Sequence, residues 1–251
     1  MNRERVNICG VWIDNCSMSE AVERVESFVS GREHAYVVTP NVDHIVRLQW
    51  DQDFRRIYEK ASLVVADGTP VLWAARYLGT PLKEKVSGSD LVPEICAMAA
   101  QKQCTLFFLG GREGAATRTK AILEKKHPRI RIVGAYSPPM GFEKKEAECQ
   151  KILEMLKQAS PNILFVGLGA PKQEKWLYQN IDRLPPLVGI GIGVTFEFMS
   201  KMVWRAPVWM QRVGLEWFWR LINEPRRLWK RYLLDDPKFF WYVWKQKRNK
   251  I

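Results

Sequence analysis

The stretch Ser62-Leu63-Val64-Val65-Ala66-Asp67-Gly68-Thr69-Pro70 indicates the fold class of this sequence. A short apolar run that ends at a turn signal is typical of a buried strand. Gly68 permits a sharp turn, Thr69 can cap a helix, and Pro70 suits the first turn of a helix that continues to Leu78. Asp67 is therefore predicted at the carboxyl end of a strand, which faces the ligand crevice in open α/β sheets. An Asp before Gly is also an ordinary turn former, so this stretch alone leaves both interpretations open.

Strands and helices are predicted to alternate on both sides of this stretch. The remaining apolar runs that indicate strands are 35–38, 105–109, 130–133, 163–168 and 187–192, and the run 6–13 indicates a first strand or the arm of a hairpin. A helix start is indicated at Ser17-Met18-Ser19-Glu20, where Ser precedes an apolar-periodic run. Alternating elements of this length predict an α/β fold with a mostly parallel sheet and helices on both faces.

The pattern changes after Thr195. Pro207, Pro225 and Pro237 each stand where proline is tolerated in a first helical turn, and they predict short helices over 208–222, 225–234 and 237–247. We place a boundary near Ser200, between an α/β core at 1–199 and a helical appendage at 200–251.

Composition restricts the class of partner. Of the net charge of +12, residues 196–251 hold 13 Lys/Arg against 5 Asp/Glu, together with seven of the eleven tryptophans. A short, basic, Trp-rich tail indicates an anionic partner, either a membrane surface or nucleic acid. The five cysteines form no CxxC pair, and the chain opens with no signal-like apolar run. These features indicate reduced core cysteines in a cytoplasmic protein without a transmembrane span.

Four loops with unusual residues leave the carboxyl ends of predicted strands. They are Thr39-Pro40-Asn41, Asp67-Gly68-Thr69, Gly110-Gly111-Arg112 and Gly169-Ala170-Pro171-Lys172-Gln173. Parallel strands would bring all four to one edge, and glycine-rich loops that enter helices can bind phosphate. Neither glycine-rich loop matches GxGxxG or the P-loop pattern, but together with the basic tail they favour a nucleotide or a nucleotide-sugar.

Metal, cofactor and nucleophile chemistry have little support in the sequence. The histidines His34, His44 and His127 lack ligand spacing, and no Gly-x-Ser-x-Gly elbow exists. Asp51-Gln52-Asp53 resembles the DxD motif by which many sugar transferases hold a metal, but its place before Phe54 favours acids at a helix start. We therefore predict no metal site and no cofactor.

The tail itself allows two interpretations. Met210, Val213, Trp217 and Leu221 recur at helical spacing, which predicts a helix with one apolar face. That face could pack on the core and leave a solvated basic face. Alternatively, the arginines bind a diphosphate while tryptophans and lysines hold the headgroup layer of a membrane.

Five motifs in one order carry a resemblance to a known family. They are Thr39-Pro40-Asn41-Val42-Asp43-His44, Ala66-Asp67-Gly68-Thr69-Pro70, Val86-Ser87-Gly88-Ser89-Asp90-Leu91, Gly167-Leu168-Gly169-Ala170-Pro171-Lys172-Gln173-Glu174, and Arg205-Ala206-Pro207 through Glu224-Pro225-Arg226-Arg227. Over nearly its whole length the sequence resembles the bacterial TagA/WecG-type glycosyltransferases, most closely those that build the wall teichoic acid linkage unit. The resemblance implies their Rossmann-like fold, called GT-E.

The resemblance also implies an activity and its partners. It implies metal-independent, inverting transfer of N-acetylmannosamine from UDP-ManNAc to the 4-hydroxyl of GlcNAc on undecaprenyl diphosphate. The partners would then be a UDP-sugar donor, a polyprenyl-diphosphate-GlcNAc acceptor and the inner face of the cytoplasmic membrane. The appendage would associate with that membrane as a peripheral element, and a homo-oligomer off the membrane stays open.

The same resemblance assigns roles to single residues. Asp67 would be the general base, with Thr39 and Asn41 beside it in the catalytic pocket. The candidate substrate-binding residues are Gln173, Lys85, Gly169, Arg212, Arg220, Arg227 and Lys230. Arg220, Arg227 and Lys230 would close over the UDP diphosphate. Lys85 and Lys230 stand where the family usually has Arg, which keeps the charge but loses the bidentate fork.

Three alternatives remain at this stage. The same fold could use another UDP-sugar for exopolysaccharide synthesis. A nucleic-acid-binding protein would use the basic tail to hold phosphates, but the tail's Trp content and the lack of a nucleic-acid motif argue against it. A dinucleotide oxidoreductase is disfavoured because GxGxxG and its downstream acidic residue are missing.

Overall fold

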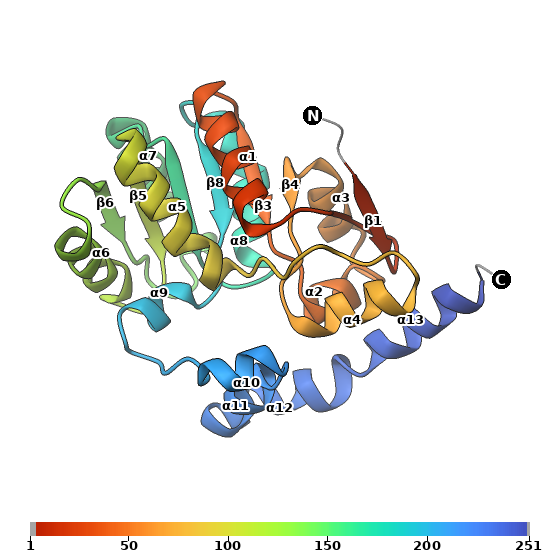
Figure 1. The fold of residues 1–251 in the computed structure, drawn as a ribbon. Helices are drawn as coiled ribbons and strands as arrows, with labels where there is room; N and C mark the ends of the chain where they lie inside the picture. The colour runs from red at the N-terminus through yellow and green to blue at the C-terminus, as the bar shows by residue number, and fades with distance from the viewer. Residues whose placement is uncertain (1–3, 250–251) are drawn as a thin grey trace.

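The computed structural model describes residues 4–249 and contains a six-stranded parallel sheet in the order β4-β3-β8-β7-β5-β6 (Figure 1). Its strands are β3 (Ala35–Val38), β4 (Leu63–Val64), β5 (Thr105–Gly110), β6 (Arg131–Tyr136), β7 (Ile163–Gly167) and β8 (Val188–Gly191). Helices cover both faces, so the predicted α/β class is confirmed.

The strands read as continuous apolar runs because both faces of the sheet are buried. Successive side chains of a strand point to opposite faces. Along β5, Leu106 and Phe108 accordingly enter one core while Phe107 and Leu109 enter the other.

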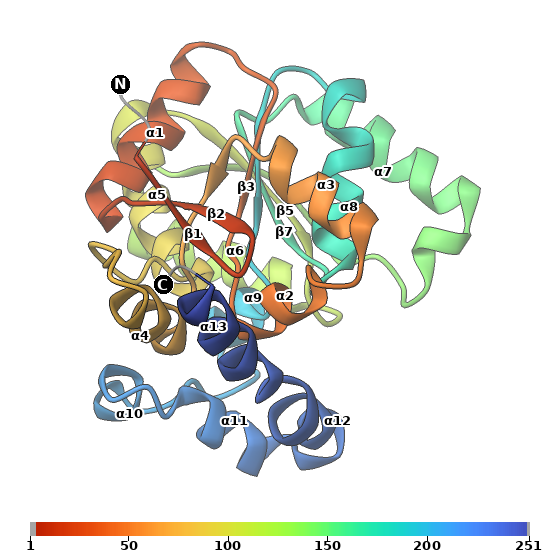
Figure 2. The same ribbon diagram turned by 90° about the vertical axis from the view of Figure 1, so that its right-hand side faces the viewer.

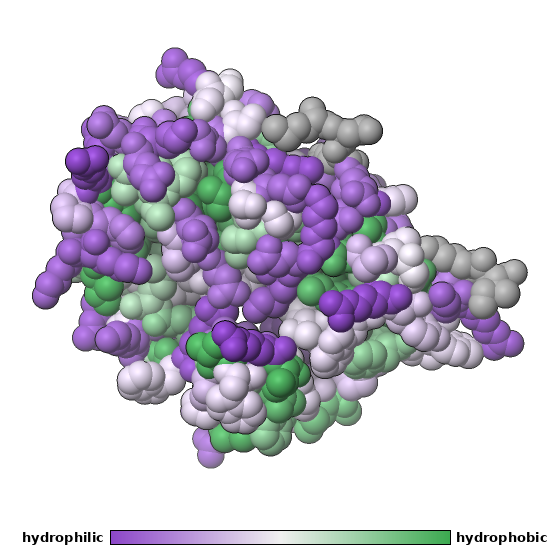
Figure 3. All heavy atoms as spheres, viewed as in Figure 1, coloured by the Kyte–Doolittle hydropathy of each residue, from purple (hydrophilic) through white to green (hydrophobic). Residues whose placement is uncertain are grey.

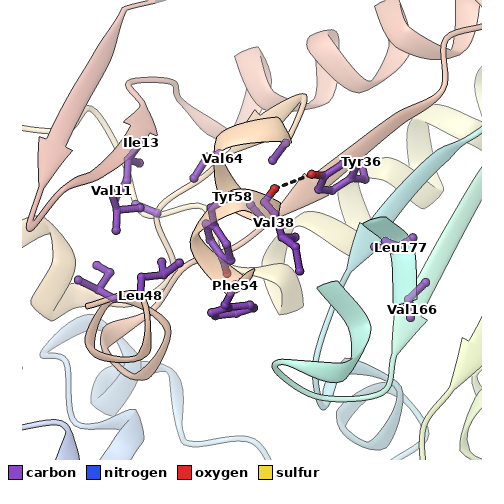
Figure 4. Packing of buried hydrophobic residues seen from close by; sticks show 14 of the residues in the cluster. Val11, Ile13, Tyr36, Val38, Leu48, Phe54, Tyr58, Val64, Val166 and Leu177 are labelled. Carbon is purple, nitrogen blue, oxygen red and sulfur yellow. Dashed lines mark hydrogen bonds between the residues drawn. The ribbon is translucent and has the colours of Figure 1, made fainter. Parts of the chain in front are cut away.

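One face of the sheet packs against α1 (Met18–Ser30), α5 (Gly88–Lys102), α6 (Ala115–Lys126) and α9 (Thr195–Met199). The other carries α2 (Val42–Arg47), α3 (Gln52–Lys60), α7 (Glu146–Ala159) and α8 (Lys172–Asn180), with short 3₁₀ turns at Phe142–Lys144 and Ile181–Arg183. Figure 4 shows Phe54 and Tyr58 of α3 packed near Val38 of β3 in this second core. The Tyr36 hydroxyl donates to the carbonyl of Ile57 at 2.5 Å, which satisfies a buried polar group.

The N-terminal segment forms an antiparallel hairpin of β1 (Arg5–Ile8) and β2 (Val11–Asp14). The Asp14 carboxylate accepts a hydrogen bond from the Val64 amide at 2.8 Å, which ties the hairpin to the sheet edge at β4. After the hairpin, Ser17 and Glu20 form a capping box at the start of α1, so the helix start predicted there is confirmed.

The turn after Ala66 leads into α4 (Thr69–Tyr77). Gly68 has φ +100° and is the residue before the helix, so the predicted role of this glycine is confirmed. The capping role predicted for Thr69 is wrong, because Thr69 is already the first helical residue and no side chain caps this end.

Residues 200–249, which we call the C-terminal arm, form α10 (Val208–Arg212), α11 (Glu216–Asn223), α12 (Pro225–Lys230), a π-helical turn (Arg231–Asp235) and α13 (Lys238–Arg248). The single helix predicted over 208–222 is wrong: the chain breaks at Gly214, which has φ +77°. Figure 2 shows the arm passing below the sheet and returning beside α4 and α2.

The end of the arm packs on the core. Phe239 and Val243 of α13 are buried in the same apolar cluster as the hairpin. The Gln246 side chain accepts from the Cys9 amide at 2.6 Å and donates to the Asn7 carbonyl at 3.0 Å. Among residues 4–249, no helix combines the length and apolar character needed to cross a membrane.

Candidate active site

A cavity of about 730 Å³ opens between the carboxyl edge of the sheet and the C-terminal arm. Its floor comes from the loops after β3, β4, β7 and β8, and its other wall from α11, α12 and the start of α13. Of the predicted site residues, it is lined by Thr39, Asn41, Asp67, Lys85, Gly169, Gln173, Arg220 and Arg227.

The loop Gly110–Arg112 is absent from this lining. It faces a different neighbour: the Arg112 amide donates to Glu197 at 3.0 Å, and its guanidinium lies 3.7 Å from the Glu224 carboxylate. Glu197 lies in α9 and Glu224 lies between α11 and α12, so this loop contacts both α9 and the middle of the arm.

Asp67 lies where β4 leads into α4, and its backbone amide donates to the Pro40 carbonyl at 2.9 Å. Burial raises the pKa of its carboxyl to about 7, and the negative charge of Glu216 acts in the same direction. Lys85 and Arg205 oppose this rise. A carboxyl with this pKa can gain and lose a proton near neutral pH, as a general base requires.

A chain of charges surrounds Asp67 and joins the core to the arm. Asp90, in the first turn of α5, lies 3.1 Å from the Lys85 ammonium and 2.7 Å from the Arg205 guanidinium. Arg205 is also 3.5 Å from the Glu216 carboxylate at the start of α11. Burial opposes ionisation of Asp90, but hydrogen bonds from Arg205 and Ser87 hold its pKa at about 2.

Asn41 is held by both the core and the arm. Its side-chain oxygen accepts from the His44 amide at 3.3 Å, which caps α2, and from the Arg231 guanidinium at 3.2 Å. Arg231 also lies 3.8 Å from the Asp43 carboxylate and 3.7 Å from that of Asp236. Thr39, in the same loop, is buried.

Gln173 joins two of the loops on the floor. Its side-chain oxygen accepts from the Gly193 amide at 3.0 Å, and its amide donates to the Glu174 carboxylate at 2.8 Å. Both side chains are buried, and burial raises the pKa of Glu174 to about 7. Gly169, with φ +73°, starts the turn that brings Gln173 to this place.

The cations predicted from the tail divide between three places. Arg220 and Arg227 line the main cavity, and Arg227 is 2.7 Å from the Glu224 carboxylate. Arg212 lies on a neighbouring pocket of about 380 Å³, and Lys230 on another of about 280 Å³.

Sequence reasoning missed Arg205, Glu216 and Arg231 as residues of this site. Arg205 lies in one of the five motifs, but its ion pair with Asp90, like that of Arg231 with Asp43, joins positions far apart in the chain, and no local pattern indicates it.

Within residues 4–249, no group of three or more His, Cys, Asp or Glu side chains is placed to hold a metal ion. Asp51 instead accepts from the Phe54 amide at 2.9 Å, and Asp53 is exposed in the first turn of α3. Their interpretation as acids at a helix start is confirmed.

A parallel α/β sheet with a buried carboxyl at its carboxyl edge, faced across a cavity by arginines of the arm, is typical of an enzyme that acts on a phosphate-containing ligand. Comparison with known proteins makes the class specific. The chain belongs to the glycosyl transferase WecG/TagA/CpsF family, whose family model matches residues 6–251. The resemblance seen in the sequence is thereby confirmed, and the protein is a glycosyltransferase.

Two curated relatives carry the same name, N-acetylglucosaminyldiphosphoundecaprenol N-acetyl-beta-D-mannosaminyltransferase. The protein from Bacillus subtilis (strain 168) is 29% identical over 94% of this chain and 90% of its own length. The protein from Staphylococcus aureus (strain MW2) is 27% identical over 99% of this chain and 95% of its own length.

Proposed function

We propose that this protein transfers N-acetylmannosamine from UDP-N-acetylmannosamine to the 4-hydroxyl of N-acetylglucosamine on undecaprenyl diphosphate. Family membership and the names of the two relatives support the sugar and the acceptor. The single observation that carries the mechanism is Asp67, a carboxyl with a pKa of about 7 in a cavity that arginines also line.

Asp67 acts as the general base in this proposal. Its carboxylate takes the proton from the acceptor hydroxyl as that oxygen attacks the anomeric carbon of the donor sugar. The bond from that carbon to the diphosphate oxygen breaks on the opposite side, so the configuration inverts and UDP departs with the electron pair. A base of this kind typically contributes about 10²–10⁴-fold to the rate.

Arg220 and Arg227 stabilise the departing diphosphate in this proposal. Both line the cavity from the arm, opposite the sheet edge that carries Asp67. Guanidinium groups form charge-assisted, often bidentate hydrogen bonds with phosphate oxygens, and such bonds act where negative charge develops. Thr39 and Asn41 position the acceptor beside the base.

The arm also brings the enzyme to its lipid-linked acceptor. Its outer surface exposes large apolar side chains, part of which appear as the apolar lower surface in Figure 3. They include Trp204, Trp209, Phe218, Ile222, Trp229, Leu233, Leu234, Phe240 and Trp241. Tryptophans and lysines on such a face are suited to a membrane–water interface. We therefore place the protein on the cytoplasmic face of the membrane as a peripheral enzyme.

A UDP-release assay with a panel of UDP-sugars and a lipid-diphosphate-GlcNAc acceptor tests the proposal. We expect acceptor-dependent release with UDP-N-acetylmannosamine that exceeds release with every other donor. In the same assay, Asp53→Asn is the matched control for Asp67→Asn, because Asp53 is exposed and lies outside the cavity lining. Faster transfer from another UDP-sugar would reject the proposed donor and favour another member of the same class of reaction.

A further inference from the structure

A second concave site adjoins the active cavity, and we call it the side pocket. It has a volume of about 380 Å³ and is lined by Thr69, Leu72, Trp73, Arg76, Lys85, Val208, Gln211 and Arg212. Four of these residues, Thr69, Trp73, Lys85 and Gln211, also line the active cavity. The side pocket therefore lies next to the chamber that contains Asp67.

Two short helices form its walls. From α4, the residues at 69, 72, 73 and 76 follow the spacing that places side chains on one helix face. From α10, the residues at 208, 211 and 212 do the same. A Cβ added at Gly214 would lie 3.1 Å from Trp73 and 3.2 Å from Thr69, so this glycine allows the arm to approach α4 closely.

Among residues 4–249, two of the three cations of the side pocket have no carboxylate beside them. Within residues 4–249, neither Arg76 nor Arg212 has a carboxylate at ion-pair distance, and both are exposed. Lys85 is the exception, with Asp90 at 3.1 Å. Arginines that converge on a concave surface without carboxylates are suited to a phosphate-containing anion.

The proposed reaction supplies two diphosphates, one in the donor and one in the acceptor. Arg220 and Arg227 in the main cavity are assigned to the donor. We infer that the side pocket binds the diphosphate of the lipid-linked acceptor through Arg76 and Arg212, a step that rests on the proposed function. Val208 and Trp209 of α10, each 62% exposed, offer an apolar surface beside it for the polyprenyl chain.

Calorimetry with farnesyl diphosphate tests the site without relying on catalysis. The titration is done on the full-length protein with saturating UDP, and farnesol serves as the uncharged ligand. We expect farnesyl diphosphate to bind more tightly than farnesol, and the Arg76→Ala/Arg212→Ala variant to weaken its binding about tenfold or more. Arg226→Ala, an exposed arginine of the same arm outside the side pocket, should leave the dissociation constant unchanged.

Three results would overturn the inference. They are equal binding of the two ligands, equal binding to wild type and double variant, and binding of farnesyl diphosphate that is seen without UDP but lost in saturating UDP. The last would assign the anion to the donor site. Because both arginines are exposed, the double variant should fold, which circular dichroism checks.

A kinetic experiment then connects the pocket to the reaction. The quantity measured is the ratio of kcat/KM for a short-chain GlcNAc-diphospholipid to that for a neutral alkyl GlcNAc glycoside. We expect this ratio to fall about tenfold in the double variant and to stay unchanged in Arg226→Ala. An unchanged ratio in the double variant rejects the side pocket as an acceptor site. Absence of sugar transfer by the wild type rejects the proposed function, and the calorimetric result then still decides whether the pocket binds a diphosphate.

Discussion

The sheet core and the C-terminal arm are stabilised by different means. Core strands bury both of their faces, as the fully buried side chains Phe108 on one face and Leu109 on the other illustrate. The arm has few buried apolar side chains, among them Met210, Leu228 and Phe239, and α11 has none. Helices as short as the five-residue α10 and the six-residue α12 are not stable in isolation. The arm therefore depends on the core for its structure.

Besides the buried Phe239 and Val243, polar contacts join the arm to the core at three places. Arg205 reaches Asp90 at 2.7 Å near the start of the arm, Arg231 reaches Asn41 at 3.2 Å in its middle, and Gln246 reaches Cys9 at 2.6 Å near its end. The proposed base therefore lies on the region with the large buried core, while the cations proposed for the leaving group lie on the region with few buried apolar side chains.

Removal of residues 200–251 should have the largest effect. We expect turnover to fall below detection, because the variant lacks every arm residue that lines the cavity. The α/β core should still fold, which circular dichroism and thermal unfolding measure. A truncated enzyme with full activity on a soluble acceptor analogue would contradict a catalytic role for the arm.

Asp67→Asn should reduce kcat by about 10²–10⁴-fold, because an amide of the same size cannot take the proton. UDP binding should change little, since the arm holds the proposed diphosphate contacts. If Asp67 were only a turn former, Asn would serve equally well and turnover would stay near normal. Steady-state kinetics with saturating donor and acceptor separates the two results.

Two phenylalanines that are both fully buried offer a matched pair of truncations. Phe165→Ala, in β7, should lower the free energy of unfolding by about 3–5 kcal/mol. Phe239→Ala, in α13, should reduce turnover while the unfolding of the core shifts much less, because it releases the arm. Urea unfolding measures the free energy of unfolding of both variants, and the UDP-release assay measures their turnover. An equal loss of free energy of unfolding in the two variants would mean that arm and core unfold as one unit.

The pH profile should report the pKa of Asp67. Because its pKa is raised to about 7 and the base form is active, kcat/KM should fall about tenfold per pH unit below that value and level off above it. Glu216→Gln removes a negative charge that raises this pKa, so the profile should shift to lower pH. Glu174, whose pKa is also about 7, provides the control. Loss of the limb with Glu174→Gln, together with no shift in Glu216→Gln, would assign the limb to Glu174.

Chelation should have the smallest effect. We expect excess EDTA to leave turnover unchanged, because the Asp51 carboxylate caps α3 and the exposed Asp53 lies outside the cavity lining. Loss of activity that Mg²⁺ or Mn²⁺ restores would contradict a metal-independent reaction.

The local sequence was sufficient to predict most helices and strands, and to place Asp67 at the end of a strand. Apolar runs predicted the strands because both faces of the sheet are buried, and Ser17 with Glu20 predicted the start of α1. The prediction of one helix over 208–222 failed, because the apolar spacing of Met210, Val213 and Trp217 continues across the break at Gly214. A single residue with positive φ overrides that periodicity.

The arrangement of the site required the structure. Four loops were predicted at one edge, but only sheet order decides which of them meet. The cavity lies over the ends of β4, β3, β8 and β7, whereas β5, which carries Gly110–Arg112, lies beyond β7. The contacts of Arg231 with Asn41 and Asp43 likewise join residues about 190 positions apart, and no local pattern records them.

The arm's position over Asp67 bears on a reaction that competes with sugar transfer. Water is also a nucleophile for an activated sugar, and a base that activates a hydroxyl would activate water as well. An enclosed chamber limits that hydrolysis by keeping bulk solvent from the donor. The wall over Asp67 belongs to the arm, which has few buried apolar side chains, so every detachment of the arm admits water to the cavity. The fraction of donor lost to hydrolysis therefore depends on contacts that hold the arm in place, such as Arg231 with Asn41 and Gln246 with Cys9.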